Sequence, residues 1–237
     1  MTKYKIAGVV FSAEFKSPQL IKLCQNYEYL GDIPEEFTLT IDKKDLQLEH
    51  AKNPDLSFSA VESYLAYSKF NEYLISSGKG LLFHSTAIAV DGNACLFTAD
   101  SGVGKSTHAK FWRELLGDKV VMINDDKPVL TIENGVVYAN GTPWQGKHKI
   151  GNNIKVPVKA ICKLERGEKD QIESCSISEM IITILRQTIL PKTQEDMDEF
   201  FKFMEVILKN VSLYKLKCTK NVSSACLAYE TILGEKL

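Results

Sequence analysis

The residues between 99 and 107 have the types and spacing most clearly suited to chemistry. A small residue, four variable positions and then Gly-Lys-Ser form the pattern of a phosphate-binding loop. The predicted phosphate-binding residues are Asp100, Ser101, Gly102, Val103, Gly104, Lys105, Ser106 and Thr107. In such a loop the glycines let backbone N–H groups wrap a phosphate, the lysine reaches the outer phosphates, and the serine hydroxyl can bind magnesium. The alternative is an ordinary glycine turn before a helix.

A second group of candidates is the acidic pair Asp125-Asp126, which follows an apolar stretch at 119–124. Carboxylates at the end of a strand beside a phosphate loop can hold magnesium or take a proton from an attacking hydroxyl. The alternative is a solvated turn that leads to Pro128.

The stretch 141–149 contains an indole and basic side chains between glycines. Trp144, Lys147 and His148 are therefore candidates for substrate contacts. Composition alone is equally consistent with a surface loop.

The elements that must position these residues are predicted from hydrophobic periodicity and turn signals. Strands are expected at 4–15, 37–41, 81–90, 94–98, 119–124, 128–132, 136–139, 159–164 and 211–218. Helices are expected to start at 17–18 and at 193, and to span 62–75, 107–116, 176–190 and 223–233. The polar stretch 42–57 is expected to be a loop or an irregular edge. The turn signals Asp91-Gly92 and Asn134-Gly135 indicate hairpins, so the phosphate loop is fed by an antiparallel hairpin. The predicted fold is a mixed α/β sheet at 78–237, with a small N-terminal α+β part at 1–77 packed on it.

Net charge, hydrophobicity and cysteine spacing argue against several classes of protein. A net charge of −1 shows no bias toward nucleic acid or an anionic membrane, and no stretch approaches membrane-spanning length. The six cysteines form no C-x-x-C pair and no zinc-like spacing. We expect a cytoplasmic protein with no nucleic-acid or membrane partner, which could be a homo-oligomer. For the lone His108 we expect a structural role.

Three features together resemble the HPr kinase/phosphorylases and their HPr-kinase-like relatives, which share a phosphoenolpyruvate-carboxykinase-like fold. They are the loop Asp100–Ser106, the sequence Asn124-Asp-Asp-Lys127, and His84, which precedes Lys105 by 21 positions. The strong resemblance covers residues 81 to about 130. Thr107 stands where the classical loop has glutamate, the glycine-rich signature after the acidic pair is absent, and residues 1–77 do not resemble the classical N-terminal domain. The Thr142-Pro-Trp loop instead resembles divergent kinases associated with peptide-modification gene sets.

This resemblance implies an ATP-dependent kinase that transfers the γ-phosphoryl group to a hydroxyl, with a peptide or protein serine as the acceptor. ATP and Mg²⁺ are the implied cofactors. Ser106 and Asp125 would hold the metal, Asp126 would act as the base, and His84 and Lys105 would complete the catalytic set. Two alternatives stay open: a small-molecule kinase, for instance of free serine, and a nucleotide-gated binding module that transfers no phosphate.

Overall fold

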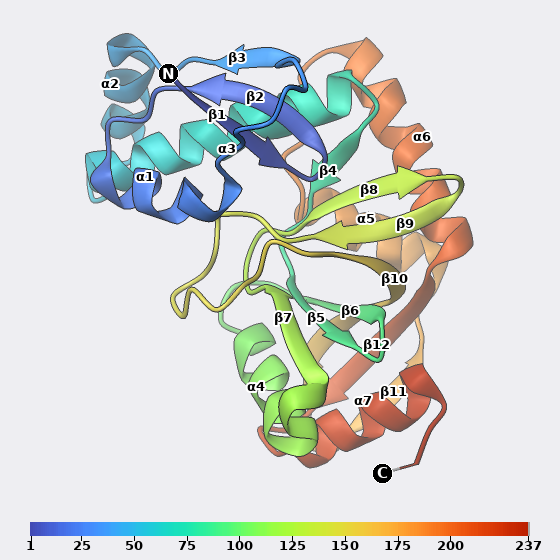
Figure 1. Cartoon of the computed structure of the whole chain (residues 1–237). Coiled ribbons are helices and arrows are strands. Elements are labelled where there is room, and N and C mark those ends of the chain that lie inside the picture. The colour runs from blue at the N-terminus through green and yellow to red at the C-terminus, as the bar shows by residue number, and fades with distance from the viewer. Residues whose placement is uncertain (237) are drawn as a thin grey trace.

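The computed structural model describes residues 1–236, and within them two sheets of different size form a mixed α/β fold (Figure 1). The smaller sheet has the order β1-β2-β3. The larger, nine-stranded sheet runs β4-β8-β9-β10-β6-β5-β7, with β12 also paired to β10 and β11 paired to β12.

The strands are β1 Thr2–Ile6, β2 Val9–Ala13, β3 Phe37–Leu39, β4 Gly80–Leu82, β5 Thr86–Val90, β6 Asn93–Thr98, β7 Val120–Asn124, β8 Val129–Glu133, β9 Val136–Asn140, β10 Lys155–Arg166, β11 Gln171–Ser174 and β12 Ser212–Cys218. The α-helices are α1 Pro18–Cys24, α2 Lys43–Lys52, α3 Phe58–Ser76, α4 Lys105–Leu116, α5 Ile177–Arg186, α6 Gln194–Asn210 and α7 Ser223–Leu233. Short 3-10 turns lie at Gln25–Tyr27 and Gly117–Lys119.

The long strand β10 joins the two halves of the larger sheet. Its first residues, 155–157, pair antiparallel with β9, whereas residues 158–163 pair parallel with β6. Residues 160–166 also pair parallel with β12. The β8–β9 hairpin is thereby connected to the strands that lead to the predicted phosphate loop.

Alternating side chains bury the two faces of this sheet in separate cores, as the two-residue period of a strand requires. In β6, Leu96 faces the core that includes residues of α5 and α6, whereas Cys95 and Phe97 face the core that includes residues of α4 and α7. Figure 1 shows α4 and α7 together at one end of the molecule and α5 and α6 beside the β8–β9 hairpin. The phosphate loop therefore leaves a strand that is covered by helices on both faces.

The N-terminal region packs on the larger sheet through a third core. This core combines residues of β1, β2 and α3, such as Phe11 and Phe70, with Leu82, Val129 and Trp144. At another point, the buried Asn71 of α3 accepts a 2.7 Å hydrogen bond from Leu82 N. The division of the chain at residue 77 remains a prediction.

Most predicted elements are present, including the hairpin of β5 and β6 that feeds the phosphate loop. Its turn has positive φ at Asp91 (48°) and Gly92 (75°), as a two-residue hairpin turn requires.

Three predictions of secondary structure were wrong. The stretch 4–15 is a hairpin of β1 and β2, with a turn at Ala7-Gly8 inside what looked like one apolar run.

The second error is the predicted loop at 42–57, where α2 forms. Asp42 caps this helix by accepting from Asp45 N, but none of its residues is buried, so the sequence shows no apolar stripe. The third is the predicted strand 81–90, which is interrupted at 83–85. There the backbone N–H groups donate to Pro128 O, Gln187 O and Asp126 O instead of continuing one ladder.

Candidate active site

The predicted phosphate loop, residues 99–107, connects the end of β6 to the first turn of α4. Gly102 and Gly104 have φ values of 80° and 131°, a region that L-residues rarely adopt. A Cβ on either glycine would meet nothing within 4 Å, so the space beside the loop is open. Within residues 1–236, no side chain caps α4 at Gly104, which leaves its first N–H groups available to an anion. The backbone therefore fits a bound phosphate.

Lys105 lies across its own loop. Its Nζ donates to Ala99 O at 2.8 Å. Burial lowers the pKa of Lys105, the charge of Asp126 opposes this shift, and the charge of Lys127 adds to it. The Lys105 ammonium is thus electrostatically coupled to the segment that carries the acidic pair.

Asp126 is held between a histidine and a lysine side chain. Its Oδ1 lies 3.1 Å from His84 Nε2 and its Oδ2 lies 2.8 Å from Lys127 Nζ. Burial alone would raise the pKa of Asp126, but the hydrogen bond from His84 and the charge of Lys127 outweigh it and lower the pKa to about 2. Asp126 is therefore ionised at neutral pH, and the structure brings His84 to it as the resemblance implies.

Asp125 faces a different environment, because adjacent residues at the end of a strand point in opposite directions. It is 4% exposed, and its Oδ1 accepts a 2.7 Å hydrogen bond from Gly146 N. Its Oδ2 is buried without a hydrogen-bond partner among the described residues. Ser106 and Asp125 line one cavity of about 650 Å³.

These observations fit a magnesium ion between Ser106 and Asp125. A buried carboxylate oxygen without a partner is costly unless a cation or donor reaches it, and oxygen ligands suit magnesium. Residues 1–236 contain no group of three or more His, Cys, Asp or Glu residues that could hold a metal. The protein would therefore supply two ligands and leave the rest to phosphates and water, which is common for magnesium.

The side chain of Asn124 holds the backbone of the segment that carries the acidic pair. Its Oδ1 accepts from Asp126 N at 2.8 Å and from Lys127 N at 2.7 Å. Its Nδ2 donates to Thr142 O and Thr142 Oγ1. Sequence reasoning did not single out Asn124 or Thr142 for this role, although an asparagine just before a turn is a signal for such side-chain-to-backbone bonds.

The loop 141–149 does not behave as one substrate-binding unit. Trp144 is 3% exposed and packs against the rings of Tyr67 and Phe70 at centroid distances of 6.1 and 5.4 Å. The prediction of a substrate contact by Trp144 is therefore replaced by a packing role. His148 is exposed and lines the cavity of Ser106 and Asp125, whereas Lys147 is exposed but does not line it.

Two further residues at the phosphate loop were missed. Arg166 Nη2 donates to Gly102 O at 2.6 Å, and Gln187 Nε2 donates to Asp100 Oδ1 at 3.3 Å. Both line a cavity of about 640 Å³ on the Ala99–Val103 side of the loop. Neither belongs to a local motif, and only the parallel pairing of β10 with β6 brings Arg166 near the loop.

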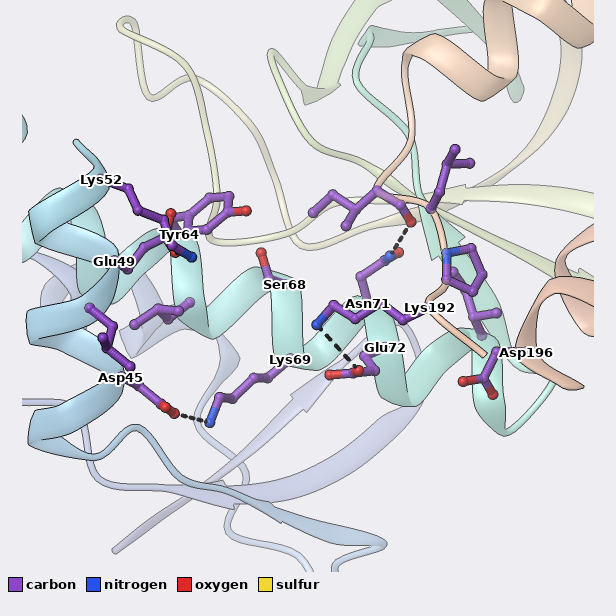
Figure 2. Close-up of a pocket in the computed structure, with 16 residues that line it drawn as sticks. Asp45, Glu49, Lys52, Tyr64, Ser68, Lys69, Asn71, Glu72, Lys192 and Asp196 are labelled. Carbon is purple, nitrogen blue, oxygen red and sulfur yellow. Dashed lines mark hydrogen bonds and ion pairs between the residues drawn. The ribbon is translucent and has the colours of Figure 1, made fainter. Parts of the chain in front are cut away.

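A separate cavity of about 460 Å³ lies between α2, α3 and residues 189–192 (Figure 2). Lys69 Nζ lies 2.6 Å from Asp45 Oδ2 there, and Asn71 Nδ2 donates to Ile189 O at 3.1 Å. None of the residues predicted for the site lines this cavity. It lies apart from the candidate active site.

No protein-family model matches the sequence, and no curated protein matches it. Among solved structures, the chain is similar to the Hpr(Ser) kinase/phosphatase from Coxiella burnetii, with 16% sequence identity and a TM-score of 0.29. The match covers 37% of this chain and 61% of that chain, less than two thirds of its length. A likeness of this size indicates a weak relationship in fold at most. No helix of residues 1–236 has the length and apolar character needed to cross a membrane.

Proposed function

We propose that the protein is an ATP-dependent kinase that transfers the γ-phosphoryl group to a hydroxyl, with a peptide or protein serine as the acceptor. The observation that carries the proposal is the position of Asp126. An ionised carboxylate with a histidine partner lies within electrostatic reach of the lysine of a phosphate-binding loop. A carboxylate repels phosphate, so its position here favours a part in the transfer step over a part in phosphate binding.

Each residue then has a defined task. Backbone N–H groups of residues 102–106 and the Lys105 ammonium hold the phosphates and disperse their charge. Ser106 and Asp125 Oδ2 hold magnesium, which supplies charge neutralisation when bound. Asp126 orients the acceptor hydroxyl and accepts its proton as the new O–P bond forms and the bond to ADP breaks.

The low pKa of Asp126 bears on this task. A carboxylate with a pKa of about 2 is a weak base while both His84 and Lys127 contact it. The same fact favours the second candidate, a nucleotide-gated binding module in which Asp126 only holds the side chains of His84 and Lys127 in place. The two functions differ in whether ATP is consumed.

The experiment is incubation with magnesium and ATP labelled at the γ-phosphate, together with serine-containing peptides and free serine, read by mass spectrometry. A labelled peptide that is absent with the Asp126→Asn variant supports the peptide kinase. Label on free serine alone would favour the small-molecule kinase. Intact ATP after long incubation, with nucleotide bound, would favour the binding module.

A further inference from the structure

Lys127 is a cation of the candidate site whose role the phosphate-loop motif does not describe. Its Nζ lies 2.8 Å from Asp126 Oδ2, and its side chain is 21% exposed. The ammonium also lies over the ring of Tyr67, 5.1 Å from the centroid. A cation in such a position is attracted by the face of the aromatic ring.

The start of this side chain is fixed on both sides. Lys127 N donates to Asn124 Oδ1 at 2.7 Å, and Lys127 O accepts from Thr142 Oγ1 at 2.7 Å. Both Asn124 and Thr142 are 0% exposed. These bonds fix the backbone of Lys127, so its side chain starts from one defined position beside Asp126.

Tyr67 comes from α3, far from the phosphate loop in sequence. Its ring packs edge-on against Trp144 at 6.1 Å, and Trp144 belongs to the core shared with the N-terminal region. The N-terminal region therefore supplies one wall around Lys127. This gives residues 1–77 a part in the site in addition to their own core.

Two lysines, Lys105 and Lys127, lie within electrostatic reach of Asp126. Lys105 and Lys127 both act on this position, since the charge of Lys127 lowers the pKa of Lys105 after burial has done so. Asp126 is paired with Lys127, whereas Lys105 is also acted on by the charge of Asp100. A terminal phosphoryl group that reached this position would find two ammonium groups as partners, and charge-assisted contacts of this kind are strong.

We propose that Lys127, positioned by Tyr67 and by the Asn124–Thr142 pair, is a second phosphate-binding lysine that contacts the terminal phosphoryl group of the nucleotide. This inference rests on the proposed function. On binding, the ammonium exchanges Asp126 Oδ2 for a phosphoryl oxygen, and Oδ2 becomes free to accept the proton of the acceptor hydroxyl. The acceptor O–P bond forms, the bond from phosphorus to ADP breaks, and Lys127 stays protonated throughout.

The test compares the affinities of the protein for ATP and for ADP in magnesium by calorimetry. Because only ATP has the terminal phosphoryl group, Lys127→Met should weaken ATP binding about tenfold or more and change ADP binding less than about twofold. The matched control is Lys69→Met, which removes another lysine paired with a carboxylate, on α3 and away from the loop (Figure 2). Equal losses for ATP and ADP with Lys127→Met, or no loss, would overturn the proposal.

Tyr67 gives an independent variant in case Lys127→Met does not fold. Tyr67→Phe keeps the aromatic face and should keep the ratio of ATP to ADP affinity, whereas Tyr67→Leu should lower it. Identical ratios for Phe and Leu would contradict the role of the ring. The kinase proposal fails separately: a wild-type protein with a Lys127-dependent preference for ATP that phosphorylates no acceptor is not a kinase, yet Lys127 still binds the phosphate.

Discussion

The side-chain amide of Asn124, the residue just before the acidic pair, donates a 3.0 Å hydrogen bond to the hydroxyl of Thr142. Thr142 Oγ1 in turn donates to Lys127 O at 2.7 Å. Asn124 ends β7 and Thr142 follows β9, so this bond joins the two segments that carry Asp125, Asp126 and His148. A fully satisfied buried polar network of this kind fixes one arrangement of the backbone.

We expect Thr142→Val to destabilise the protein by about 1–3 kcal/mol, because the Asn124 amide and the Lys127 carbonyl each lose a buried partner. Thr142→Ser keeps the hydroxyl and should lose less than about half of that, through the missing methyl group. Urea unfolding of the three proteins measures the difference. A valine variant as stable as the wild type would show that the network does not hold the segment.

Local signals made part of this structure predictable. The hairpin that feeds the phosphate loop is encoded by Asp91-Gly92, where the glycine tolerates a positive φ, and by alternating apolar residues on both sides. The loop glycines, Lys105 and the acidic pair could likewise be found because their chemistry depends on close spacing in sequence.

Other features depend on contacts between distant residues and left no local signal. Arg166 reaches Gly102 across 64 positions, and only the pairing of β10 with β6 creates that contact. Trp144 looked like a substrate contact because its loop is rich in glycine and basic residues. Its burial against Tyr67 and Phe70 requires the position of α3, which the loop sequence does not contain.

The second prediction concerns Lys105. Among the described residues, its Nζ donates only to Ala99 O, a bond within its own loop, so Lys105→Ala should leave the fold and the melting temperature nearly unchanged. Loss of a charge-assisted contact to phosphate should weaken magnesium-ATP binding about tenfold to a hundredfold and abolish transfer. Calorimetry measures the affinity for magnesium-ATP, and a turnover assay measures the transfer. Unchanged affinity in a folded variant would remove the loop from nucleotide binding.

The third prediction is a pH dependence that arises from His108. This residue is 2% exposed, Trp112 Nε1 donates to its Nε2 at 3.0 Å, and burial lowers its pKa from 6.5 to about 4. The unfolded chain therefore binds the proton at a higher pH than the folded chain does. Stability should be fully present above about pH 6.5 and should fall as the pH is lowered toward 4, by up to about 3 kcal/mol.

Urea unfolding between pH 7 and pH 4 measures this slope. The His108→Gln variant has no titrating side chain at position 108. Its stability should therefore fall less steeply with decreasing pH than that of the wild type. A steeper or equal slope in the variant would mean that other groups cause the acid sensitivity.

The fourth prediction concerns the loop 141–149. It distinguishes Trp144, which packs in the core, from Lys147 and His148, which remain candidates for substrate contacts. Trp144→Ala should destabilise the protein by about 3–5 kcal/mol, because it removes a buried aromatic side chain from the core shared with α3. His148→Ala should leave stability unchanged within about 0.5 kcal/mol and raise the KM for the acceptor, since His148 lines the cavity of Ser106 and Asp125. Lys147→Ala, outside that cavity, serves as the comparison. Equal kinetics for wild type and His148→Ala would make this part of the loop an ordinary connection.

The last prediction distinguishes Asp125 from Asp126 by their amides. Asp126→Asn removes the proton acceptor but keeps an oxygen for the hydrogen bond from His84. It should bind magnesium-ATP almost normally and lose transfer by about 10²- to 10⁴-fold, the contribution of a positioned base. The defect should not respond to added magnesium.

Asp125→Asn should fail in another way, for a reason that its surroundings make specific. Gly146 N donates to Oδ1, so the single oxygen of an asparagine is held there and the NH₂ group takes the place of Oδ2. That group cannot bind a cation, and the variant should require more magnesium, with activity partly restored at high concentration through Ser106 and the phosphates. Magnesium titrations of both variants decide the assignment. An Asp126→Asn defect that magnesium corrects, beside an Asp125→Asn defect that it does not, would exchange the two roles, and full activity in both would refute phosphoryl transfer at this site.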